Sequence, residues 1–99
     1  MTAPNDMFID AEWSVASDGA REDIVNPATE ETADSVPVAT TADLDRALAA
    51  ADRGWRQWRQ ADAWTRSAAL RKIAGITRDR ADEIAAVLTE EQGKPLAEA

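Results

Sequence analysis

The strongest constraint on the fold is a change of periodicity at residue 40. Beyond it, apolar residues recur every three or four positions, the spacing of one buried face of an α-helix. The residues of this stripe are Leu44, Ala47, Leu48, Ala51, Trp55 and Trp58. Thr40 is the predicted N-cap of the helix, and Asp43 makes its first turn acidic. Gly54 costs about 1 kcal/mol relative to alanine, so the second half of the helix is the weaker half.

Two further helices are predicted after this one. Asp62 is the predicted N-cap of the second helix, which ends near Asp79, and a third run extends from about Asp82 to a stop at Gly93. The second helix has an apolar face made of Ala69, Leu70, Ile73, Ile76 and Thr77. Pro95 then opens a fourth helix of which only "PLAEA" is present, so we expect the chain to be the front piece of a longer protein.

The residues before position 40 predict short strands separated by turns. Residues 1–6 form an expected disordered lead, and residues 7–38 contain four short strands, the first two joined as a tight hairpin. Turns are predicted around Gly19 and at "NPAT", and Pro37 is restricted to a sheet edge or strand end. With the helical part at 40–99, the expected fold of the chain is α+β.

Composition excludes several functions. The 99 residues include no cysteine, histidine or tyrosine, which removes the thiolate nucleophile, the commonest general base and the usual soft metal ligands. A net charge of -8 disfavours nucleic acid, and no apolar run is long enough to span a membrane. The absence of cysteine and of a signal-like N-terminus favours a cytoplasmic protein. Carboxylates close in sequence, such as Asp43 and Asp45 or Glu90 and Glu91, are interpreted as solvated faces, because helix residues one or two positions apart point about 100° or 200° apart and do not converge.

The segment "RGWRQWRQADAWTR" allows two interpretations. Tryptophans interleaved with arginines can stack on and neutralise single-stranded nucleic acid. However, Trp55 and Trp58 share a helical face with Leu44 and Leu48, so a packing role is favoured. Trp64 lies off this stripe and is either a first-turn packing residue or a contact to chain that is not present.

Longer stretches of the sequence resemble the N-terminal segment of the aldehyde dehydrogenase superfamily. They are "FIDAEW", "VNPATEE", "VPVATTADLDRALAAADRGWRQWR" and "RSAALRKIAGITRDRADEIAAVLTEEQGKPLAEA". The resemblance covers Phe8 to Ala99, and "EQGKPLAEA" is its most specific part. The register of "VLTEEQGKP" is similar to that of succinate-semialdehyde dehydrogenases.

The resemblance implies a parent enzyme with an α/β, Rossmann-like cofactor domain that oxidises an aldehyde to a carboxylic acid, with NAD or NADP as acceptor. In the family the catalytic cysteine and glutamate and the cofactor loops lie beyond the matched stretch. No catalytic and no cofactor-binding residue is therefore expected here, and the chain alone is expected to be inactive and to bind no cofactor. The implied partners are the remainder of the dehydrogenase chain and its subunits, the parent being a homo-oligomer.

One site of the family falls inside the matched stretch. Some members hold a structural monovalent cation between a main-chain carbonyl just before "NP" and the acidic residue two before the glycine of "GKP". Here those positions are Val25, or alternatively Ile24, and Glu91. The alternative is that Glu91 is simply exposed in the last turn of its helix.

Two turns depart from the family pattern. Ala11 stands where the first hairpin usually has glycine, and Glu30 replaces the glycine of "NPATGE". If these turns need a positive φ, each substitution costs about 1 kcal/mol or forces a different turn.

Two functional hypotheses follow. The chain is either the N-terminal part of an aldehyde dehydrogenase or a small non-enzymatic interaction module that docks on a partner protein. A molten isolated chain would favour the first, and a cooperatively folded monomer the second.

Overall fold

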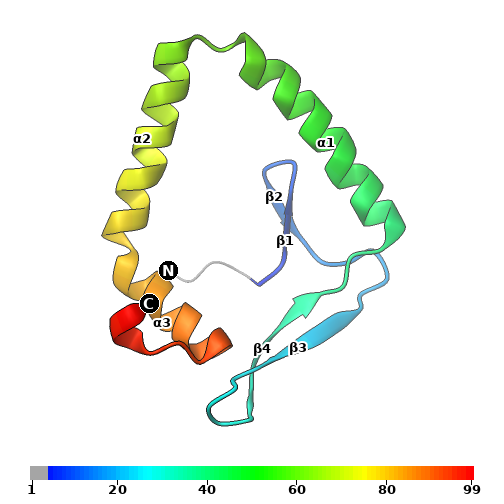
Figure 1. Ribbon diagram of the computed structural model, residues 1–99. Coiled ribbons are helices and arrows are strands. Elements are labelled where there is room, and N and C mark those ends of the chain that lie inside the picture. The colour runs from blue at the N-terminus through cyan, green and yellow to red at the C-terminus, as the bar shows by residue number, and fades with distance from the viewer. Residues whose placement is uncertain (1–4) are drawn as a thin grey trace.

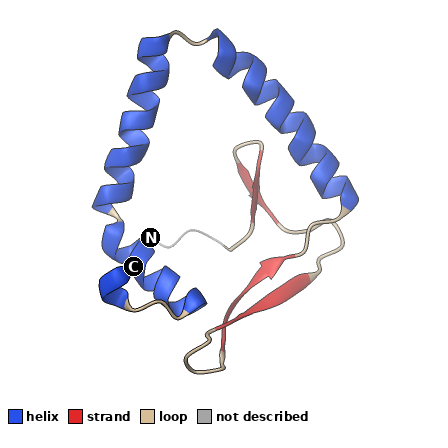
Figure 2. Ribbon diagram, in the orientation of Figure 1, coloured by secondary structure: helices blue, strands red, loops and turns tan. Residues whose placement is uncertain are grey.

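The computed structural model describes residues 5–99 and confirms the division of the chain near residue 40 (Figure 1). Strands β1 (Met7–Ile9), β2 (Glu12–Ser14), β3 (Arg21–Val25) and β4 (Thr32–Pro37) come first. Helices α1 (Thr41–Gln60), α2 (Ala63–Asp79) and α3 (Ala81–Gln92) follow. The chain past Pro95 makes only the 3-10 turn η1 (Leu96–Glu98), where a fourth helix was expected. The α+β expectation is thus confirmed (Figure 2).

The strands form two separate antiparallel hairpins. In the first, Phe8 pairs with Trp13, and their rings lie 4.9 Å apart between centroids. In the second, β3 pairs with β4 from Arg21 opposite Pro37 to Val25 opposite Thr32, with an irregularity between Ile24 and Val25. Pro37 is the last residue of β4, as expected of a residue that cannot donate to a sheet ladder.

The turn residues keep the geometry that glycine usually supplies. Asp10 and Ala11 have φ of 55° and 63°, which is the positive-φ pair of a two-residue hairpin turn. Glu30 has φ of 62° in the turn between β3 and β4. The chain therefore accepts strain at these positions and does not change turn type.

The helix boundaries follow the predicted caps. Thr40 accepts a hydrogen bond from the Asp43 amide, and the Asp43 carboxylate accepts one from the Thr40 amide, which completes a capping box. Asp62 accepts from the Thr65 amide at the start of α2. Gly93 ends α3 in the left-handed conformation, and its amide donates to the Thr89 carbonyl.

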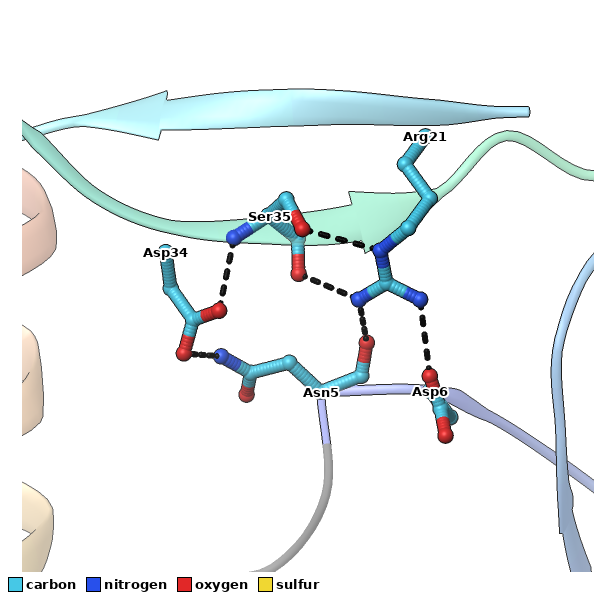
Figure 3. Close-up of polar contacts among 5 residues, drawn as sticks. All are labelled: Asn5, Asp6, Arg21, Asp34 and Ser35. Carbon is cyan, nitrogen blue, oxygen red and sulfur yellow. Dashed lines mark hydrogen bonds and ion pairs between the residues drawn. The ribbon is translucent and has the colours of Figure 1, made fainter. Parts of the chain in front are cut away.

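The expected lead and the expected burial both differ from the structure. Residues 1–4 of the lead lie outside the described residues, whereas Asn5 and Asp6 are held by Arg21 against β3 and β4 (Figure 3). The stripe of α1 forms one face as predicted. Residues 5–99 do not bury this face, since Leu48 and Trp55 are 60% and 56% exposed. Ala16 is the buried apolar residue of the described chain.

The chain as a whole exposes more surface than a compact domain of its mass. Its accessible surface is 7795 Å², whereas a compact monomer of 10.7 kDa exposes about 5,500 Å². Its radius of gyration is 16.8 Å, against about 13 Å for a compact chain of this length. Figure 1 shows the reason: α1 and α2 run along two sides of an open frame, α3 and the β3–β4 hairpin lie along the third, and the β1–β2 hairpin lies inside the frame in this view.

Candidate functional site

One candidate site lies on the apolar faces of α1 and α2. Between the end of α1 and the start of α2 lies an open groove of about 560 Å³. Its lining residues are Trp58, Ala63, Arg66, Ser67, Leu70, Arg71 and Ala74. Trp58 is 43% exposed and Leu70 is 60% exposed, so both are available to a covering surface. A wide apolar face rimmed by charged residues is typical of an interface with another protein surface.

Trp55 and Trp64, the other two tryptophans of this region, do not line the groove. Trp55 carries the guanidinium of Arg59 over its ring, at 4.8 Å from the centroid. Trp64 is 86% exposed at the start of α2, in keeping with its position off the stripe. Arg59 thus covers part of Trp55, whereas Arg53 and Arg56 form exposed ion pairs with Asp10 and Asp52.

Asp43 is the residue that the sequence interpretation missed. It was expected on a solvated face, but it is 1% exposed. Its carboxylate accepts hydrogen bonds from the Ser17 amide at 3.0 Å, the Thr40 amide at 2.9 Å and Arg46 at 3.1 Å. The Thr40 and Ser17 amides hold the pKa of the Asp43 carboxyl far below its ordinary value of 3.8. Asp43 therefore joins the loop after β2 to the start of α1.

The N-cap at Thr40 was predicted from the sequence, but the partner Ser17 was not. Ser17 lies far from Asp43 along the chain, and its hydroxyl also bonds the Thr40 hydroxyl at 2.7 Å. A contact between a loop amide and a carboxylate leaves no pattern in the sequence, because any residue except proline supplies the same amide.

The segments that carry Val25 and Glu91 lie next to each other. A Cβ atom added to Gly93 would lie 2.8 Å from Pro27 Cγ, so the turn after β3 touches the end of α3. An open pocket of about 400 Å³ runs along this junction. It is lined by Asn26, Ala28, Ala86, Thr89, Glu90, Gly93, Lys94, Pro95 and Leu96. The glycine at position 93 is thus required by its positive φ and also by the close approach of Pro27.

Catalytic and metal-binding groups are scarce in the described part of the chain. Within residues 5–99 no group of three or more histidine, cysteine, aspartate or glutamate residues is arranged to hold a metal ion. In the same range, no helix has the length and apolar character needed to cross a membrane. The features described are an exposed apolar groove between α1 and α2, the Asp43 contacts to Ser17, and the approach of Pro27 to Gly93.

Comparison with known proteins agrees with this geometry. Residues 13–99 match the aldehyde dehydrogenase family. Glutarate-semialdehyde dehydrogenase of Pseudomonas putida is 42% identical over 92 residues, which cover 93% of this chain and 19% of that protein.

Solved structures show the same arrangement of elements. A point mutant of betaine aldehyde dehydrogenase from Staphylococcus aureus, in complex with NAD+, superposes with a TM-score of 0.90 at 32% identity, covering 95% of this chain and 19% of that one. Succinate-semialdehyde dehydrogenase from Burkholderia pseudomallei superposes with a TM-score of 0.87 at 39% identity, covering 91% and 19%. The chain spans about a fifth of the length of these relatives. The chain belongs to the aldehyde dehydrogenase family.

Proposed function

We propose that this chain is the N-terminal part of an NAD(P)-dependent aldehyde dehydrogenase and acts as a scaffold on which the rest of the subunit packs. The observation that carries the proposal is the excess surface of about 2,300 Å² over a compact monomer. An excess of this size matches the large, obligate class of protein interfaces. In the proposed interface with the rest of the subunit, the exposed apolar residues of α1 and α2 would lie at the centre.

The proposed substrate is a semialdehyde. Two of the relatives are named as glutarate- and succinate-semialdehyde dehydrogenases, and both are more similar in sequence to this chain than the betaine aldehyde dehydrogenase is. The proposed acceptor is NAD or NADP, which would supply the hydride-accepting chemistry when bound to the complete subunit. The residues of this chain would hold neither the cofactor nor the reacting groups. A cytoplasmic homo-oligomer is the state proposed for the complete enzyme.

A monovalent cation at Val25 and Glu91 is a second part of this proposal. The contact between Pro27 and Gly93 supports it, because each of these residues lies two positions from one of the two proposed ligands. A main-chain carbonyl and a carboxylate are oxygen ligands that suit a hard cation, and the rest of the subunit would complete the shell. If the cation is held there, replacing Glu91 with glutamine in a complete enzyme should remove any difference in thermal stability between potassium and lithium buffers.

The decisive test is a chimera. Residues 8–99 replace the matching segment of the Pseudomonas putida enzyme, and oxidation of glutarate semialdehyde is followed through the reduced nicotinamide formed. The expected result is a soluble, active chimera, because the faces of α1 and α2 would find the surface they fit. A chimera that is insoluble or inactive, while the parent enzyme is active under the same conditions, would refute the scaffold.

The interaction-module alternative predicts a different outcome in a second assay. A free module would bind the complete Pseudomonas putida enzyme, whereas a scaffold segment would not, since the segment of that enzyme already occupies the position. Titration of the isolated chain into the complete enzyme, followed by calorimetry, separates the two. The isolated chain should also oxidise no aldehyde above background.

A further inference from the structure

The groove between α1 and α2 combines apolar side chains with two cationic groups. Arg66 and Arg71 are among its lining residues, and none of the residues that line it is acidic. The two arginines lie five positions apart on α2, which is about 7.5 Å along the helix axis, and Leu70 lies between them in the sequence. Both arginines are exposed. A surface that covers this groove therefore contacts guanidinium groups as well as apolar side chains.

Arg66 and Arg71 have no carboxylate partner among residues 5–99, since no ion pair within this range includes either of them. A cover over the groove removes water from their guanidinium groups, and a charge that loses water without gaining a partner is strongly unfavourable. The covering surface must therefore supply oxygen acceptors. Carboxylates are the acceptors whose geometry matches a guanidinium group.

Charge is divided unevenly along the chain. Residues 41–80, which span α1 and α2, hold nine basic and five acidic side chains, whereas the rest of the chain holds two basic and fourteen acidic ones. The net charge of -8 thus comes from the strands and α3, while α1 and α2 together are positive. An acidic surface is attracted to these two helices and not to the rest of the chain.

We propose that the groove receives a segment of the rest of the subunit in which apolar side chains are flanked by carboxylates, and that these carboxylates pair with Arg66 and Arg71. The inference rests on the proposed function, because the occupant is the part of the subunit that packs on this chain. The apolar part of the segment covers Trp58 and Leu70, which are 43% and 60% exposed. The carboxylates set its position, since a bidentate pair with arginine has a fixed geometry.

Two other occupants fit the same residues less well. Single-stranded nucleic acid stacks successive bases on aromatic rings, and Trp58 is the one aromatic residue in the lining. A second copy of the chain is repelled by the net charge of -8 on each copy. A carboxylate-bearing segment of the same subunit needs neither a row of aromatic rings nor the approach of a second acidic chain.

The test compares the chimera of residues 8–99 with the Pseudomonas putida enzyme and the isolated 99-residue chain. Arg66→Gln and Arg71→Gln each remove one charge from the groove, and Lys72→Gln is the matched control on an exposed position of α2 that does not line it. In the chimera, each arginine substitution should speed thermal inactivation by about ten-fold, the effect of losing a hydrogen bond to a charged group. Arg71→Lys keeps the charge and should lose less than Arg71→Gln. In the isolated chain, thermal loss of helical circular dichroism should be the same in all variants, because the arginines have no carboxylate partner there.

The outcomes separate this proposal from the scaffold itself. An active chimera in which Arg66→Gln and Arg71→Gln inactivate no faster than Lys72→Gln would overturn the proposal and leave the scaffold in place. An inactive chimera removes the scaffold, and the proposal fails with it. Binding of a labelled oligothymidylate by the isolated chain, weakened by Arg71→Gln and not by Lys72→Gln, would assign the groove to nucleic acid instead. Dimers in sedimentation that are lost in the same variant would assign it to a second copy.

Discussion

Replacing Leu70 with alanine should have a small cost in the isolated chain and a large cost in the chimera with the Pseudomonas putida enzyme. In the isolated chain the Leu70 side chain is 60% exposed, so less than half of its apolar surface is lost. Full burial of a leucine contributes about 1.5–3 kcal/mol, which limits the cost there to about 1 kcal/mol. In the chimera the same face is covered, and a leucine-to-alanine change in a packed core costs about 2–5 kcal/mol.

Two assays measure the two contexts. Thermal loss of helical circular dichroism reports the isolated chain, and urea unfolding reports the chimera. Lys72→Ala is the control, because position 72 lies about 200° around α2 from position 70 and should cost little in either context. If Leu70→Ala costs the same in both contexts, the face of α2 gains no cover in the larger protein, and the scaffold reasoning fails.

Four further substitutions test the contacts between segments and the turns of the chain. The pKa of the Asp43 carboxyl is lowered on folding, so its stabilisation is present above about pH 4 and is lost as the pH falls below that value. Asp43→Asn should therefore reduce the acid-dependent loss of helix followed by circular dichroism, while Asp62 and Glu83, whose pKa values are also lowered, keep their part of it. Ala11→Gly and Glu30→Gly should each stabilise the chimera by about 0.5–1 kcal/mol in urea unfolding, because φ of 63° and 62° strains a side-chain residue; destabilisation would contradict the assigned turns. Gly93→Ala should destabilise the chimera by about 2 kcal/mol or more. The new Cβ would lie 2.8 Å from Pro27 Cγ, and a φ of 73° strains any residue with a side chain. An unchanged urea unfolding midpoint would exclude the contact with Pro27.

Much of the local structure could be predicted from short patterns. The caps at Thr40 and Asp62 and the stop at Gly93 are local, because each depends on hydrogen bonds within a few residues. A positive φ at Ala11 and Glu30 was one of two alternatives that the sequence left open, and the structure shows that this one holds. The candidate cation ligands Val25 and Glu91 came from the family resemblance and stay a prediction.

The candidate site was predictable in part. The apolar stripe of α1 was placed correctly as a face that needs a partner surface, but the extent of its exposure came from the structure, because periodicity tells which residues share a face and not what covers them. The burial of Asp43 and the hydrogen bonds of Arg21 to Asp6 and Ser35 could not be predicted. Their partners Ser17, Asp6 and Ser35 are remote in sequence and have no required side-chain type beyond an oxygen or an amide.

The sequence by itself determined the four strands, the three helices with their approximate ends, and the resemblance to the family. These depend on local periodicity, on caps and on motifs such as "EQGKPLAEA", all of which are read along the chain. Tertiary structure alone decided that Asp43 is buried, that Arg21 spans three segments, and that the faces of α1 and α2 remain open. The physical reason is that burial and long-range hydrogen bonds depend on which surfaces meet in space, and the surface that these helices fit is not supplied by residues 5–99.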